Sequence, residues 1–129
     1  MLIAANCFAA ESHNFNDIKA AVANGKNIRL VIDFEKCSTP NNLLAESRKG
    51  VFTPNEMQIT DDHIAASLMH FTLNHPNFLG KPIYEYSRYT ITADNLEFNV
   101  QPLDAITYAP LAEKFSVKCK LDAAVKVYL

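Results

Sequence analysis

The chain has 129 residues, of which 49% are hydrophobic and 20% are charged, so it is long enough for one domain with a real core. The net charge is −2, and acidic and basic residues are interspersed. This balance argues against nucleic acid as a partner, because phosphate binding needs a concentrated basic face. No apolar run approaches the roughly 20 residues that a transmembrane helix requires. We expect one globular domain without a transmembrane segment.

The first ten residues resemble the end of a secretory signal peptide. They read MLIAANCFAA, and the polar segment ESHNFND follows, which places a cleavage point after Ala9 or Ala10. The match lacks a positively charged start. We expect residues 1–10 to be a signal-peptide remnant and residues 11–129 to be one exported domain. A short buried strand or a frayed end is the alternative, and Cys7 matches a lipoprotein cysteine only weakly.

The next segments predict a helix followed by a strand. Asn14 suits an N-cap, and Gly25 suits the position after the helix end, so the helix is expected over Phe15 to Asn24. In Ile28 to Cys37, IRLVIDFEKC, apolar and polar side chains alternate, as in a strand with one buried face. We expect the apolar stripe of the helix to pack on the sheet that contains this strand.

The middle of the chain holds the main ambiguity. Residues 38–50 are polar and irregular, with one possible helical turn at 43–48. Residues 62–74 fit a helix capped by Asp61 or Asp62, and they also fit a strand in which alternate side chains face one side. We favour the strand, because clear hairpins follow it.

The last third of the chain predicts antiparallel hairpins. Residues 83–92, IYEYSRYTIT, are rich in β-branched and aromatic side chains, and a half-buried return strand runs from Leu96 until Pro102 ends it. A weaker extended segment is expected at 105–111. Two short strands complete the chain, over residues 115–121 and 125–129. The fold class is therefore α+β, with one short N-terminal helix packed on a mainly antiparallel, strongly curled β-sheet or small barrel.

The cysteines indicate a disulfide bond. If Cys7 leaves with the signal peptide, Cys37 and Cys119 remain, and two cysteines in an exported domain are more often bridged than free. Cys37 follows the first strand, and Cys119 lies on the apolar face of a late strand. A bridge would bring the two ends of the β region together. Two separate buried thiols are the alternative.

Tyr84, Tyr86 and Arg88 form the candidate binding face, because they share one side of the strand at residues 83–92. Aromatic and arginine side chains are enriched at protein interfaces. The alternative is a sheet face covered by the helix or by a loop. Positive charge also lies on the outward side of the last two strands, where lysines typically protect an edge strand from pairing, at Lys114, Lys118, Lys120 and Lys126.

Weak metal-ligand candidates lie at Asp61, His63 and His70, beside Asp62. Carboxylates and imidazoles suit zinc or manganese. The spacing is poor for one site, because the two histidines point to opposite faces of a strand or lie two turns apart on a helix. The chain has no G-x-S-x-G motif for nucleophilic catalysis. We expect no catalytic residues and no cofactor.

The order of these segments resembles the VirK family of small exported bacterial proteins. The resemblance rests on the helix ending in NGK, then IRLVIDFEKC, FTPNEMQITDDHIAASLMHFTL, YEYSRYTIT, and a late KC before a terminal VKVYL. It implies a protein exported by bacteria that interact with hosts, located in the periplasm or secreted, with a cysteine pair matching Cys37 and Cys119. It does not point to any particular activity, because the family has no assigned biochemical function.

Three functions are therefore considered. The favoured hypothesis is an exported, virulence-associated binding protein without enzymatic activity, which contacts an unknown protein partner. The second is a carrier that holds a small apolar ligand inside the barrel. The third is a metal-dependent enzyme that uses Asp61, His63 or His70.

Overall fold

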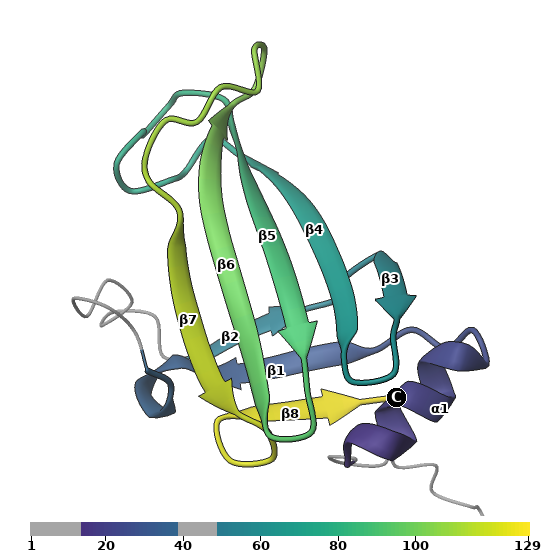
Figure 1. Cartoon of the computed structure of the whole chain (residues 1–129). Helices are drawn as coiled ribbons and strands as arrows, with labels where there is room; N and C mark the ends of the chain where they lie inside the picture. Colours follow the sequence, from purple (N-terminus) through teal and green to yellow (C-terminus); the bar gives the residue numbers. More distant parts are fainter. Residues whose placement is uncertain (1–13, 39–48) are drawn as a thin grey trace, which may run out of the picture.

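The computed structural model describes residues 14–38 and 49–129, which form one helix and two antiparallel sheets (Figure 1). The predicted signal-peptide remnant at 1–10 and the possible helical turn at 43–48 lie outside these residues. In chain order the elements are α1 (Phe15–Ala23), β1 (Arg29–Asp33), the 3-10 turn η1 (Phe34–Lys36), β2 (Lys49–Phe52), β3 (Glu56–Ile59), β4 (Ile64–Thr72), β5 (Ile83–Ile91), β6 (Asn95–Asp104), β7 (Phe115–Lys120) and β8 (Val125–Tyr128).

Helix α1 begins where the sequence predicts and ends one residue early, at Ala23. The Asn14 side-chain oxygen accepts a hydrogen bond from the Asp17 backbone N–H at 3.0 Å, which satisfies a donor that the first helical turn leaves free. Ile18 and Ala21 are the buried residues of the helix. The helix lies beside β3 and contributes Ile18 to the main core.

The three-stranded sheet has the order β2-β1-β8, so the first strand pairs with the last strand of the chain. Strand β1 ends at Asp33, earlier than the predicted end just before Cys37, because Phe34–Lys36 turn into η1. The turn still buries the Phe34 ring, which lies 6.3 Å from Phe52 and 6.1 Å from Phe98 between ring centroids. Aromatic packing therefore takes the place of the predicted strand extension.

The five-stranded sheet has the order β3-β4-β5-β6-β7, with every neighbouring pair antiparallel. The strand prediction for the ambiguous region is confirmed by β4, and the helical alternative is wrong. Nine residues of β4 pair with β5, from Ile64 opposite Ile91 to Thr72 opposite Ile83. Backbone pairing over this length outweighs the slight helical preference of the side chains.

Strand β6 continues through Pro102 to Asp104, so the predicted strand end at Pro102 is wrong. The Pro102 carbonyl accepts a hydrogen bond from the Leu111 N–H at 2.9 Å, so the carbonyl and nitrogen of Pro102 both point away from β5. Its missing N–H therefore costs no bond to β5, which explains why the strand tolerates it. The extended segment expected at 105–111 is instead a turn followed by a single bridge, Leu103 to Pro110.

The two sheets are open and separate, so the expected strongly curled sheet or small barrel is not what the strands form. In Figure 1 the strands of the three-stranded sheet run across the lower ends of β4 to β7. The core fills the space between them, with Leu30, Ile32 and Val127 on one side and Tyr89 and Phe98 on the other. Two crossed layers can enclose a core of this size without closing into a barrel.

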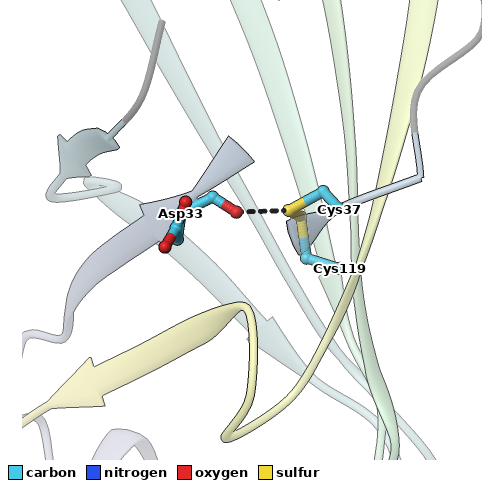
Figure 2. The surroundings of a disulfide bond; sticks show 3 residues. All are labelled: Asp33, Cys37 and Cys119. Atoms are coloured by element: carbon cyan, nitrogen blue, oxygen red, sulfur yellow. Dashed lines mark hydrogen bonds between the residues drawn. A yellow bond between two sulfur atoms is a disulfide. The ribbon is translucent and has the colours of Figure 1, made fainter. Parts of the chain in front are cut away.

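A disulfide bond between Cys37 and Cys119 joins the end of η1 to β7, with 4.4 Å between the two Cα atoms (Figure 2). The backbones of Ser38 and Lys118 also exchange hydrogen bonds beside it, at 2.7 and 2.9 Å. Cys37 Sγ lies 3.3 Å from the Asp33 carbonyl oxygen, and a bridged sulfur has no hydrogen to donate there. The bond therefore fastens the two sheets at one corner.

We expect reduction of this disulfide to lower the free energy of unfolding by about 4–5 kcal/mol, because the bridge spans 82 residues in the sequence and restricts the unfolded chain. Urea unfolding of the oxidised and the reduced protein measures the difference. The double variant Cys37→Ala, Cys119→Ala should resemble the reduced protein and should not respond to reductant. Equal stability of the oxidised and reduced forms would contradict the expectation.

Candidate functional site

The five-stranded sheet has an outer face, which is the side turned away from the three-stranded sheet. Side chains on it form rows across the strands, because paired residues point the same way. One row contains Glu56, Ser67, Arg88 and Asn99, and it is polar. The next two rows, Met69-Tyr86-Gln101 and Phe71-Tyr84-Leu103, are mainly apolar and aromatic. The outer face therefore changes from polar to aromatic towards the end of the sheet that bears the loops at 73–82 and 105–114.

Five side chains at this end form what we call the aromatic patch, namely Met69, Phe71, Tyr84, Tyr86 and Tyr108. The Phe71 and Tyr84 rings meet edge to face with centroids 5.6 Å apart, and Tyr84 and Tyr108 stack at 6.0 Å. Met69, Phe71 and Tyr108 are 45%, 50% and 58% exposed. Rings that contact one another and remain open to solvent are typical of a contact surface rather than of a core.

The loop after β6 holds Tyr108 in place, at the top of Figure 1. The Asp104 carboxylate accepts the backbone N–H groups of Ile106 and Thr107, both at 2.9 Å, and the Asp104 carbonyl accepts the Tyr108 N–H. Tyr108 has a φ of 59°, a left-handed conformation that is uncommon for a side chain of this size. The hydrogen bonds to Asp104 offset this strain, which directs the Tyr108 ring onto Tyr84.

Hydrogen bonds from the Thr107 and Ile106 backbone lower the pKa of Asp104 below its ordinary value of 3.8, and the nearby Lys81 adds to the effect. Lys81 Nζ lies 3.6 Å from Asp104 Oδ2. The charged carboxylate is therefore the form that organises the loop at neutral pH. The same loop leaves Ile106 at its apex 88% exposed.

A shallow depression of about 370 Å³ adjoins the aromatic patch on the outer face. Small side chains of β4, Ala65 and Ser67, form its floor, and Glu56 lies on one side with Tyr86 and Arg88 on the other. It is open to solvent, and opposite charges flank it. The depression suits a side chain of a bound partner better than it suits an enclosed small molecule.

The structure places all three residues of the predicted binding face, Tyr84, Tyr86 and Arg88, on the outer face. Among residues 14–38 and 49–129, the loop after β6 covers part of Tyr84 with the side chain of Tyr108, whereas Phe71 and Tyr108 themselves are exposed. Sequence reasoning missed Met69, Phe71 and Tyr108. The strand register was needed to bring the first two beside the tyrosines. For Tyr108 the sequence offered a weak indication. An aspartate such as Asp104 often accepts hydrogen bonds from backbone N–H groups two or three residues later, and this predicts a turn just before Tyr108.

The metal-ligand candidates are not brought together. Thr60 Oγ1, Asp62 Oδ1 and His63 Nδ1 form a small cluster at the β3-β4 turn, with separations of 2.8–3.0 Å, and the hydrogen bond from His63 lowers the pKa of Asp62. His70 lies seven residues along β4, roughly 20 Å away for an extended chain. Within the described residues, no three histidine, cysteine or acidic side chains could hold a metal ion.

The space between the sheets is occupied by core side chains. Tyr89 stacks on Phe98 with ring centroids 5.3 Å apart, and both rings contact Phe52. Burial among these rings raises the pKa of Tyr89 to about 12. The depression described above lies outside this core, and it is not the interior ligand site that the carrier hypothesis requires.

The fold and the site define a small α+β domain with two crossed sheets, one disulfide bond and an aromatic outer face. The sequence matches the VirK family, described as VirK protein, over residues 11–108, and the chain belongs to this family. A search of the curated proteins found no match. In the described part of the chain, no helix has the length and apolar character needed to cross a membrane.

Among solved structures, the chain is similar to the crystal structure of lpg1832, a VirK family protein from Legionella pneumophila. The two share 32% sequence identity and superpose with a TM-score of 0.86, and the match covers 94% of this chain and 100% of the Legionella chain. This similarity extends the family relationship beyond residue 108 to nearly the whole chain.

We expect the substitution Asp104→Ala to loosen the loop that carries Tyr108, because two backbone N–H groups lose their acceptor. Amide hydrogen exchange of Ile106 and Thr107 should become faster, and the ring signals of Tyr84 should shift. Asp104→Asn is the matched control, since it keeps a side-chain carbonyl and should have a smaller effect.

Lowering the pH should loosen the loop that carries Tyr108, as the substitution Asp104→Ala does. The pKa of Asp104 is lowered in the folded state, so its stabilising effect is present above pH 3.8 and is lost as the pH falls through the lowered value. If the Ile106 and Thr107 amides exchange at the same rate in Asp104→Ala as in the wild type at neutral pH, the role assigned to the carboxylate is wrong.

Proposed function

We propose that this VirK family member is an exported, virulence-associated binding protein without enzymatic activity, and that its aromatic patch contacts a protein partner. The observation that carries the proposal is the exposure of Phe71 and Tyr108, whose rings both contact Tyr84 on the outer face of the five-stranded sheet. Exposed aromatic clusters with a polar border are typical of protein interaction sites.

The composition and rigidity of the patch support a protein partner. Tyrosine, phenylalanine, methionine and arginine are the side chains enriched at interfaces, and Arg88 lies one row below Tyr86. Strand pairing fixes four of the five patch residues, and Tyr84 supports the fifth. Preorganised side chains lose little conformational entropy on binding, so more of their contact energy is available as affinity.

Export is supported by the family relationship and by the disulfide bond. A bond between Cys37 and Cys119 persists in oxidising compartments such as the bacterial periplasm or the extracellular medium, and it is rare in the cytosol. An exported location also gives the exposed patch access to partners outside the cytoplasm. The proposed location is therefore periplasmic or secreted.

Site-specific photocrosslinking tests the proposed contact surface. With a photoreactive phenylalanine analogue at Phe71 or Tyr86, we expect the protein produced in its own cell to crosslink to the same partner from both positions. Glu97 is the matched control, because it lies on the outer face of the same sheet but at the polar end. Crosslinks from Glu97 alone, or equally from all three positions, would refute the patch as the contact surface.

Once that partner is purified, Tyr84→Ala should weaken binding roughly thirtyfold, which corresponds to about 2 kcal/mol for a central aromatic contact. Thr90→Ala removes a side chain from the same strand and the same face outside the patch, and it should leave the affinity within twofold or so. Isothermal titration calorimetry measures both. Equal affinities of the two variants would exclude Tyr84 from the contact.

Intact mass spectrometry of the protein exported by its own cell tests the proposed location. We expect a mature chain that starts near Ala10 or Glu11. Its mass should also be lower by two hydrogen atoms than that of the same chain after reduction, because Cys37 and Cys119 are bonded. An uncleaved and fully reduced chain would refute export.

A further inference from the structure

We propose that the free edge of β4, at residues 68–72, binds an extended segment of the partner protein as an added β-strand. This inference rests on the function proposed above and specifies the kind of partner. The segment would adopt strand conformation and would carry apolar side chains at alternate positions. Such strand addition obtains affinity from backbone hydrogen bonds and specificity from alternate side chains.

Strand β3 covers only the first part of β4. Its four residues pair with Ile64–Ser67, and the Asn55 N–H adds a hydrogen bond to the Ser67 carbonyl at 3.3 Å. Pro54 precedes Asn55 and has no N–H with which to extend the ladder. Among residues 14–38 and 49–129, no strand pairs with β4 beyond Ser67 on this side, as the upper half of β4 in Figure 1 shows.

The backbone of this edge points outward in a defined pattern. The Ser67 carbonyl faces β3, and residues two apart in a strand present their N–H and C=O groups to the same side. Met69 and Phe71 therefore direct both groups to the open edge, while His70 between them directs its groups to β5. The edge offers two donors and two acceptors to an incoming strand.

This edge lacks the features that normally prevent strand pairing. Residues 68–73, LMHFTL, contain no lysine, arginine, acidic residue or proline. The opposite edge of the same sheet differs, because β7 exposes Lys118 and Lys120 and Ser38 bridges to its backbone. One edge of the sheet is protected and the other is not, which points to the unprotected edge as a binding position.

The side chains along the edge specify the occupant further. An added strand would place alternate side chains beside Met69 and Phe71, which are 45% and 50% exposed, and would extend the aromatic patch sideways. Its intervening side chains would lie beside His70 on the other face, where the position is exposed to solvent. The expected segment therefore alternates apolar residues on the outer face with polar residues on the inner face.

The test uses the oxidised full chain and a phage-displayed library of random linear peptides nine residues long. We expect the selected peptides to alternate apolar and polar residues. In amide hydrogen exchange, Met69 and Phe71 should exchange fast in the free protein and should be slowed roughly tenfold or more by a bound peptide. N-methylation of the peptide at alternate positions should weaken binding roughly tenfold per lost hydrogen bond, and methylation of the intervening residues should not.

Two variants of the protein test the same edge. Phe71→Ala removes the ring and keeps the backbone N–H, whereas Phe71→Pro removes both. Because the Phe71 N–H does not bond to β5, its loss leaves the pairing of β4 with β5 in place. The proline variant should bind the selected peptides more weakly than the alanine variant, by roughly tenfold. If the proline variant does not fold, the pair of methylated peptides still decides the question.

Three outcomes would overturn the inference: selection of no peptide, peptides that bind without protecting the Met69 and Phe71 amides, and a free protein that is already a dimer with these amides protected. The last outcome would make a second copy of the chain the occupant. Crosslinking from Tyr86 without edge protection would leave the proposed function intact and refute strand addition. Protection of the Met69 and Phe71 amides without crosslinking from Tyr86 would support strand addition and refute the aromatic patch as the contact surface.

Discussion

Burial of one half of the five-stranded sheet by the three-stranded sheet is the constraint on which the rest of the structure depends. Strands β1, β2 and β8 have four or five residues each, whereas β4, β5 and β6 have nine or ten. The shorter strands cover the rows around Ile91 and Tyr89, and the longer strands extend beyond them. The loop at 73–82 covers the inner face of the extension, where Ile83 is fully buried and His75 lies 3.8 Å from Glu85. In the part of the chain that the structure describes, no strand or helix covers the outer face or pairs with one edge, and both proposals concern these surfaces.

The outer face of the five-stranded sheet combines a polar region with an aromatic one. Near the core, its rows carry charged and polar side chains such as Glu97 and Lys118, which water solvates well. Farther along the same strands, the rows become aromatic, and the loop anchored by Asp104 adds Tyr108. The strained backbone of Tyr108 has no role in the core, and its effect is to complete the patch. This arrangement separates the residues that fold the domain from those available to a partner.

Much of the architecture was predictable from the sequence, because alternation fixes which strand residues are buried. The N-cap Asn14 and strands β5 to β8 follow from local patterns, whereas β4 was assigned from the hairpins that follow it. The pairing of Cys37 with Cys119 came from the number of cysteines expected in the mature chain. The division into two sheets was not predictable, since it depends on β1 pairing with β2 and β8, which are distant in sequence. For the same reason, only two of the five residues of the aromatic patch were predictable. Tyr84 and Tyr86 share a strand, whereas their neighbours come from other elements through the register.

Pairing of β1 with β8 also determines when the chain can fold. The first strand ends at Asp33 and the last begins at Val125, so the small sheet cannot assemble until the C-terminal residues have been synthesised. Contacts between such distant segments slow folding, because the loop between them must close before any of the contacts form. A nascent chain that lacks its final strand has no complete layer to cover the large sheet. Deletion of only its last few residues would therefore leave an incomplete core.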